Sequence, residues 1–113
     1  MMILYGIPHC DTVKKSRAWL DAHKLAYQFH DFKKLGVPAD ALDLWTSTLG
    51  WEALVNTKGT TWRKLGAQQQ AAVVDAASAK ALMLREASVV KRPVLVAGSV
   101  VTVGFNPQAW ALL

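Results

Sequence analysis

Cys10 is the only cysteine in this chain of 113 residues, and its sulfur is the strongest nucleophile that the sequence offers. It lies in the polar turn Pro8-His9-Cys10-Asp11-Thr12, between a short apolar run and a segment with helical periodicity. Unpaired amides and the positive end of the helix dipole lower the pKa of a thiol at a helix N-terminus. Three cations follow within two turns: Lys14, Lys15 and Arg17. The pattern favours a reactive thiolate over a buried, inert cysteine, which is the common alternative for a lone one.

A disulfide formed by Cys10 needs a sulfur from another molecule. The second cysteine of a C-x-x-C motif would stand at position 13, and this residue is Val13. The chain therefore has no local resolving thiol. A free thiol such as glutathione is the expected partner, and a second protein is the alternative.

Arg92 is the first candidate for a group that assists the thiol. It precedes Pro93 and a pair of β-branched runs, and a guanidinium forms charge-assisted hydrogen bonds with a thiolate or an anion. A solvated arginine ahead of a strand is the alternative interpretation. His9, next to Cys10, could also assist, although a loop histidine without a chemical role is the more common case.

Asn56–Lys64 is a polar segment, interrupted by Gly59, that leads into a helix. Its asparagine, its lysines and its backbone amides could bind a carboxylate or an oxyanion. A turn with a threonine cap and a solvated basic face explains the same residues equally well.

Other site chemistries lack their patterns. Neighbouring His9 and Cys10 cannot easily bind one metal ion, and the sequence has no paired cysteines and no H-x-x-x-H spacing. A Ser-His-Asp triad has no nucleophile elbow, and the glycine patterns of phosphate and dinucleotide loops are missing from the sequence. We therefore expect neither a metal nor a bound cofactor.

The composition is 52 % hydrophobic and 19 % charged, which suits one domain that buries a core without disulfides. The net charge of +5 suits an anionic partner, but the basic residues are scattered, so nucleic-acid binding is disfavoured. The first residues do not resemble a signal peptide, and glycine, asparagine and proline interrupt the uncharged stretch Pro93–Leu113. We expect a cytoplasmic monomer without membrane contact.

Hydrophobic patterning predicts a β-α-β unit at the beginning of the chain. A strand is expected over Ile3–Gly6, a helix from Asp11 or Thr12 to about His23, and a second strand over Tyr27–Asp31. Two such strands joined by a helix are parallel, with a right-handed crossover.

The middle of the chain is expected to be helical. The predicted helices run from Pro38 to Leu49, over Trp51–Val55, over about Gln68–Ala76 and over Ser78–Glu86.

The end of the chain predicts a hairpin and a helix. Val94–Val96 and Val100–Val103 flank Gly98-Ser99, which suits a two-residue turn of type II′, and Asn106-Pro107 can begin a helix that reaches Leu112. The order βαβ, helices, ββα predicts an α/β fold with a thioredoxin-like mixed sheet. We expect one domain over 1–113, with a core of about 1–35 and 91–113 and a helical insertion of about 37–90.

Four segments together resemble the ArsC/Spx family, and within it the YffB-type branch. The likeness covers the chain in order, and the segments are Tyr5–Lys15, Phe29–Lys34, Asn56–Arg63 and Lys91–Pro93. The resemblance implies that Cys10 is a nucleophile. In this layout the proline, here Pro93, lies opposite the cysteine loop, typically after a cis peptide bond.

True arsenate reductases of the family hold the oxyanion with three arginines, and only one of them is matched here. Arg92 corresponds to the arginine before the proline, whereas the other two positions fall on Asn56 and near Val103-Gly104. Each lost charge-assisted hydrogen bond weakens binding by roughly 1.5–3 kcal/mol. The resemblance therefore makes arsenate a poor substrate.

The YffB-type branch implies a glutathione-dependent thiol/disulfide reductase with one nucleophilic cysteine. Glutathione is expected as a co-substrate, beside a thiol or disulfide substrate, and glutaredoxin is a further candidate partner. The alternatives are an arsenate reductase, or a non-catalytic regulator that binds RNA polymerase as Spx-type members do. The predicted site residues are catalytic Cys10 and Arg92, and substrate- or glutathione-binding His9, Asn56, Lys58, Arg63 and Pro93.

Overall fold

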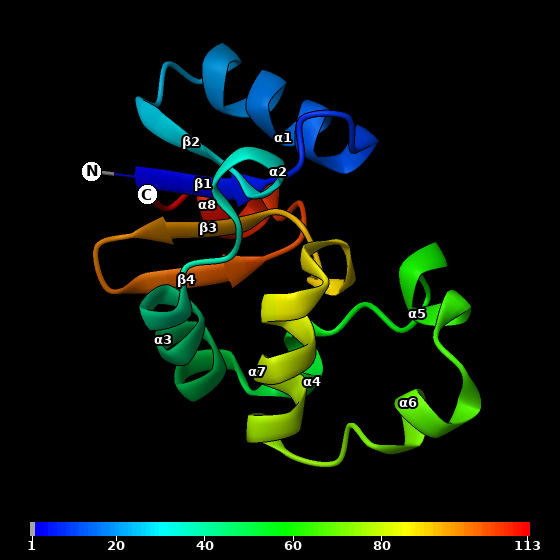
Figure 1. Ribbon diagram of the computed structural model, residues 1–113. Coiled ribbons are helices and arrows are strands. Elements are labelled where there is room, and N and C mark those ends of the chain that lie inside the picture. Colours follow the sequence, from blue (N-terminus) through cyan, green and yellow to red (C-terminus); the bar gives the residue numbers. More distant parts are fainter. Residues whose placement is uncertain (1) are drawn as a thin grey trace. The chain divides into compact units, whose positions relative to one another are not determined.

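A computed structural model of the chain describes residues 2–113, and its strands form one mixed sheet of four (Figure 1). The strands are β1 (Met2–Gly6), β2 (Tyr27–Asp31), β3 (Val94–Ala97) and β4 (Val100–Val103), in the order β2-β1-β3-β4. β1 is parallel to β2 and antiparallel to β3, which is antiparallel to β4. In Figure 1 the blue β1 lies beside the orange β3, although about ninety residues separate them in the sequence.

The β-α-β unit is present as predicted. Helix α1 (Asp11–Ala22) connects β1 to the parallel β2, and its buried side chains recur with helical spacing at Val13, Ser16 and Leu20. The Ser16 hydroxyl donates a 2.7 Å hydrogen bond to the carbonyl of Thr12, which allows a polar side chain to be buried in the first turns.

The predicted hairpin and the last helix are also present. Of the two turn residues only Gly98 has a positive φ (60°), as expected for a glycine at the first central position of a type II′ turn. Helix α8 (Pro107–Trp110) begins where predicted, with Asn106 Oδ1 accepting from the amide of Ala109 at 3.2 Å. It ends two residues before Leu112.

Leu4, Leu20, Leu95 and Trp110 form a buried cluster that joins the sheet to α1 and α8. A hydrogen bond holds the Trp110 indole in this cluster: its Nε1 donates to Thr102 Oγ1 on β4 at 2.9 Å. Trp19 and Phe105 pack edge-on against the same indole. A mixed four-stranded sheet with this order of helices is a thioredoxin-like α/β fold, as the sequence predicts.

The chain divides into two compact units. The first takes the chain up to Leu35 together with Arg92–Leu113, and the second is Gly36–Lys91. Short helix α2 (Phe32–Leu35), which the sequence analysis missed, follows β2 directly in the first unit, where Asp31 Oδ1 accepts from the amide of Lys33 at 2.8 Å.

The second unit is helical. It contains α3 (Ala39–Leu49), α4 (Trp51–Leu54), α5 (Thr60–Lys64), α6 (Ala67–Ala71), α7 (Ala76–Arg85) and the 3₁₀ turn η1 (Ala87–Val89). α7 packs against α3 and α4, and the buried side chains of the unit include Trp45, Leu54 and Leu82.

The prediction of one helix over Gln68–Ala76 is wrong. α6 ends at Ala71, and a separate helix begins at Ala76, two residues before the predicted start at Ser78. The physical reason is a capping box: Asp75 Oδ1 accepts from the amide of Ser78 at 2.9 Å, and Ser78 Oγ accepts from the amide of Asp75 at 3.1 Å. This pair is the start signal for α7, and it interrupts a segment whose alanines favour one continuous helix.

We predict that Asn106→Ala lowers the free energy of unfolding by about 1 kcal/mol, because it removes the side-chain acceptor at the beginning of α8. Asn106→Asp keeps an acceptor oxygen and should lose far less. Chemical denaturation of the two variants and the wild type checks this. Equal losses in both variants would contradict the capping role.

Candidate active site

Cys10 occupies the N-cap position of α1, directly after the turn that leaves β1. Its backbone is held on both sides: the amide of Cys10 donates to the carbonyl of Ile7 at 3.1 Å, and its carbonyl accepts from the amide of Lys14 at 2.9 Å. The side chain is half-buried and carries a free thiol. The sulfur is therefore accessible and fixed at the N-terminus of a twelve-residue helix.

Arg92 and Pro93 lie at the same end of the sheet. The Arg92–Pro93 peptide bond is cis, Pro93 is buried, and its carbonyl accepts a 2.8 Å hydrogen bond from the amide of Gly104, just after β4. Arg92 is half-buried, and its Nε atom is fully buried. The solvated arginine that was the alternative interpretation therefore does not describe this side chain in full, because part of it is withdrawn from solvent.

Strand pairing explains why these two segments meet. In the β1–β3 register Tyr5 pairs with Val94, so the end of β1 and the beginning of β3 share one edge of the sheet. The turn that carries Cys10 follows the first of these ends, and Arg92-Pro93 precedes the second. The first unit alone therefore brings Cys10, Arg92 and Pro93 together.

The electrostatic surroundings favour the thiolate. Partial burial raises the pKa of the Cys10 thiol, but several interactions lower it: those with the amide of Val13, with the Arg92 guanidinium and with the amide of Thr12. The net result is a pKa below the usual value for a cysteine. Among the described residues no amide forms a capping hydrogen bond of ordinary geometry with this side chain, so the two amides act on the sulfur electrostatically.

His9, the other predicted residue of the turn, is exposed beside Cys10.

The other three predicted site residues, Asn56, Lys58 and Arg63, belong to the second unit. Asn56 Oδ1 accepts a hydrogen bond from the amide of Lys58 at 3.2 Å, which forms an Asx-turn. A Cβ on Gly59 would lie 2.8 Å from Asn56 Nδ2, so any other residue there would require the Asn56 side chain to shift. Lys58, in the turn, and Arg63, on α5, are exposed.

Lys91 joins Asn56 and Lys58 around a cavity of about 240 Å³ in the second unit. The amide of Asn56 donates to Val89 at 2.8 Å and the amide of Lys91 donates to Leu54 at 2.7 Å, so the two chain segments run side by side. Glu52 also lines the cavity. Lys91 was not among the predicted site residues, because nothing in the neighbouring sequence indicates this long-range pairing.

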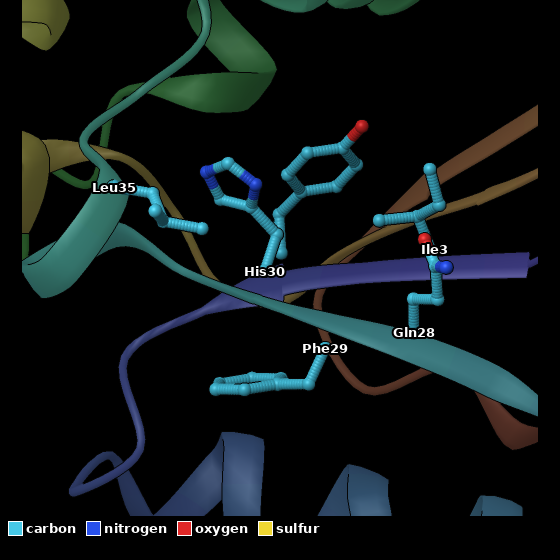
Figure 2. A pocket seen from close by; sticks show the side chains of 6 residues that line it. Ile3, Gln28, Phe29, His30 and Leu35 are labelled. Carbon is cyan, nitrogen blue, oxygen red and sulfur yellow. The ribbon is translucent and has the colours of Figure 1, made fainter.

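A larger cavity, of about 390 Å³, lies in the first unit away from Cys10. It is lined by residues from β1, β2 and α2: Ile3, Tyr5, Gln28, Phe29, His30 and Leu35. Figure 2 shows Phe29 on the opposite side of the β2 ribbon from His30, as alternation along a strand requires. Burial raises the pKa of Tyr5. None of the predicted site residues lines this cavity.

Two further features are absent from residues 2–113. No cluster of three or more histidine, cysteine or acidic side chains could hold a metal ion within this range. No helix in the same range is long and apolar enough to cross a membrane.

A thioredoxin-like sheet with one low-pKa cysteine at the N-terminus of α1, and an arginine before a cis-proline, defines a thiol oxidoreductase-like class of protein. Residues 5–112 match the model of the ArsC family, and this chain belongs to that family.

Relatives agree with this assignment. A solved structure of a YFFB protein is 48 % identical, superposes with a TM-score of 0.94 and covers 99 % of this chain and 97 % of its own. An uncharacterized protein of Haemophilus influenzae is 33 % identical over 110 residues, 97 % of this chain and 96 % of the relative. The global transcriptional regulator Spx of Streptococcus mutans is 27 % identical over 111 residues, 94 % of this chain and 77 % of the regulator.

We predict that Arg92→Ala raises the apparent pKa of Cys10 and slows its alkylation about tenfold at neutral pH, because a charge-assisted interaction with the thiolate is lost. In the wild type the alkylation rate of Cys10 should increase with pH at a lower pH than for an ordinary cysteine, because the pKa of its thiol is lowered. Arg92→Lys should restore part of the rate, since it keeps the charge without the planar fork. Alkylation rates measured against pH check both variants.

Thermal unfolding is the control for this prediction. Because Arg92 is half-buried rather than enclosed, we expect Arg92→Ala to cost about 1 kcal/mol of stability or less. A variant that alkylates as fast as the wild type, with an unchanged pH profile, would show that Arg92 does not act on the thiol.

Proposed function

We propose that this protein is a glutathione-dependent thiol/disulfide reductase that uses Cys10 as its single nucleophile. The observation that carries the proposal is a thiol of lowered pKa beside Arg92 in a chain with one cysteine. A thiolate of this kind attacks disulfides readily, and with no second cysteine in the chain its adduct must be resolved by an external thiol.

The reaction has two exchange steps. The Cys10 thiolate attacks the glutathione sulfur of a mixed disulfide, so that a Cys10–glutathione disulfide forms and the substrate leaves as a thiolate, which takes up a proton. The thiolate of a second glutathione then attacks the glutathione sulfur of this adduct. Oxidised glutathione leaves, and Cys10 returns as a thiolate. Overall, one mixed disulfide and one molecule of glutathione give the substrate thiol and oxidised glutathione, and the proton lost by the resolving glutathione balances the one taken up by the substrate.

The distribution of charge supports an anionic partner. The first unit, which carries Cys10, has three acidic residues (Asp11, Asp21 and Asp31) and seven basic ones, whereas the second unit has five acidic and six basic residues. The basic residues of the first unit are Lys14, Lys15, Arg17, Lys24, Lys33, Lys34 and Arg92. Glutathione is an anion at neutral pH, so it is attracted to this unit.

The roles of His9, Asn56, Lys58, Arg63 and Pro93 in binding glutathione belong to this proposal. Pro93 is buried, and it lies at the same end of the sheet as Cys10. Lys58 and Arg63 offer exposed positive charge, and Asn56 and Lys58 line a cavity. Glutaredoxin is proposed as an alternative source of the resolving thiol.

A regulator that binds RNA polymerase is the second candidate function, because a transcriptional regulator is among the relatives that align over most of this chain. Position 13 separates the two candidates chemically. A C-x-x-C redox switch needs a second cysteine there, and this chain has Val13. Binding of polymerase that is unchanged in Cys10→Ser would support the regulator.

Mass spectrometry of the protein after incubation with oxidised glutathione tests the proposed function. We expect one glutathione adduct on Cys10, which reduced glutathione removes, and catalytic reduction of a small glutathione mixed disulfide. Cys10→Ser is the matched control and should show neither reaction. A folded wild type whose Cys10 alkylates but neither forms the adduct nor turns over would overturn the reductase proposal.

We predict that arsenate is a poor substrate even in the presence of glutathione and glutaredoxin. The neutral residues Asn56, Val103 and Gly104 stand where the resemblance expects arginines, and each absent charge-assisted hydrogen bond costs roughly 1.5–3 kcal/mol of binding. Arsenite production measured over a range of arsenate concentrations checks this. Rapid turnover at low arsenate would contradict the prediction and would require other cations, such as Lys58 or Arg63.

A further inference from the structure

Gly6, the last residue of β1, lies against the first turn of α1. A Cβ built on Gly6 would be 2.8 Å from Cγ2 of Val13 and 3.3 Å from its Cγ1. Real Cβ contacts are essentially never as short as 2.8 Å, so a side chain at position 6 would force Val13 or the strand to shift. Val13 cannot turn its side chain into solvent, because it is fully buried.

Space, rather than backbone conformation, requires the glycine at this position. Gly6 belongs to a strand, and the described glycines with positive φ are others: Gly36, Gly50, Gly98 and Gly104. An alanine could therefore adopt the backbone of Gly6, but its methyl group would push Val13 and the first turn of α1 away from the strand.

Val13 connects this packing to the thiol. The interaction with its amide is one of those that lower the pKa of the Cys10 thiol, beside those with the Arg92 guanidinium and the amide of Thr12. The turn between Gly6 and Val13 is short, and the hydrogen bond from the amide of Cys10 to the carbonyl of Ile7 closes it. The first hydrogen bond of the helix follows directly, from the amide of Lys14 to the carbonyl of Cys10. A displacement of Val13 therefore changes the position of its amide relative to Cys10 Sγ.

We propose that Gly6 is a positioning residue for Cys10: its missing side chain lets β1 lie against Val13, and this contact places the first amides of α1 beside the thiol. The inference deepens the proposed function, since it names what sets the nucleophilicity of the proposed catalytic sulfur. It does not depend on which disulfide Cys10 attacks.

The test is a double-mutant cycle with the variants Gly6→Ala, Val13→Ala and Gly6→Ala/Val13→Ala. The apparent pKa of Cys10 is measured from the rate of alkylation by iodoacetamide against pH, with no glutathione present. We expect Gly6→Ala to raise this pKa by about half a unit, which slows alkylation about threefold below the pKa. In the Val13→Ala background, where the two Cγ atoms are gone, the same change should leave the pKa unaltered.

Gly66→Ala is the matched control. Gly66 has a φ of −67°, which any residue can adopt. A Cβ added to Gly66 would have no heavy atom within 4 Å apart from those of its immediate surroundings in the chain, so an alanine there is tolerated without displacement. Its Cys10 pKa should equal that of the wild type. Thermal unfolding of every variant separates a loss of stability from a change in the thiol.

Each outcome of the cycle decides the proposal. An unchanged pKa in Gly6→Ala, or an equal shift in both backgrounds, would overturn it. If Gly6→Ala does not fold, the double variant decides: a folded double variant with the pKa of Val13→Ala supports the steric contact, and one that is unfolded or shifted refutes it. Alkylation needs no glutathione, so the two proposals fail in different ways. If only the reductase proposal fails, the pKa values of Cys10 follow the expected double-mutant cycle, but Cys10 forms no adduct with glutathione.

Discussion

The antiparallel pairing of β1 with β3 is the constraint on which the Cys10 site depends. The pairing of Tyr5 with Val94 brings the end of one strand to the beginning of another that is distant in the sequence. The turn with Cys10 and the Arg92-Pro93 segment extend from these two ends. Because the sheet is held by backbone hydrogen bonds and by the buried cluster of Leu4, Leu95 and Trp110, the positions of the thiol and the guanidinium follow from the core.

The thiol reflects a balance between burial and local charge. Removing the sulfur from water disfavours its ionised form, and this is the largest single influence on Cys10. The amides of Val13 and Thr12 and the Arg92 guanidinium together outweigh it. A half-buried thiol with such neighbours is protected from bulk water but still ionises easily, which is the combination that nucleophilic exchange requires.

Local sequence signals predicted much of this arrangement and missed what depends on contacts between distant segments. The glycine of the hairpin, the Asn106-Pro107 start of α8 and the polar turn at Cys10 each carry a local physical signal, and the structure has each element there. The interruption between α6 and α7 carried a signal as well, in Asp75 and Ser78, but the surrounding alanines masked it. The contact of Gly6 with Val13 and the pairing of Asn56 with Val89 have no signature within a short window, because packing alone creates them.

Position 13 shows how one packing requirement bears on the chemistry. A resolving cysteine in a C-x-x-C motif would stand at Val13, whose side chain is fully buried and in contact with the end of β1. Here that side chain fills space in the core while its amide acts on the thiol. The same residue therefore contributes to the nucleophilicity of Cys10 and leaves it without an internal partner. Any disulfide that Cys10 forms therefore needs a sulfur from another molecule.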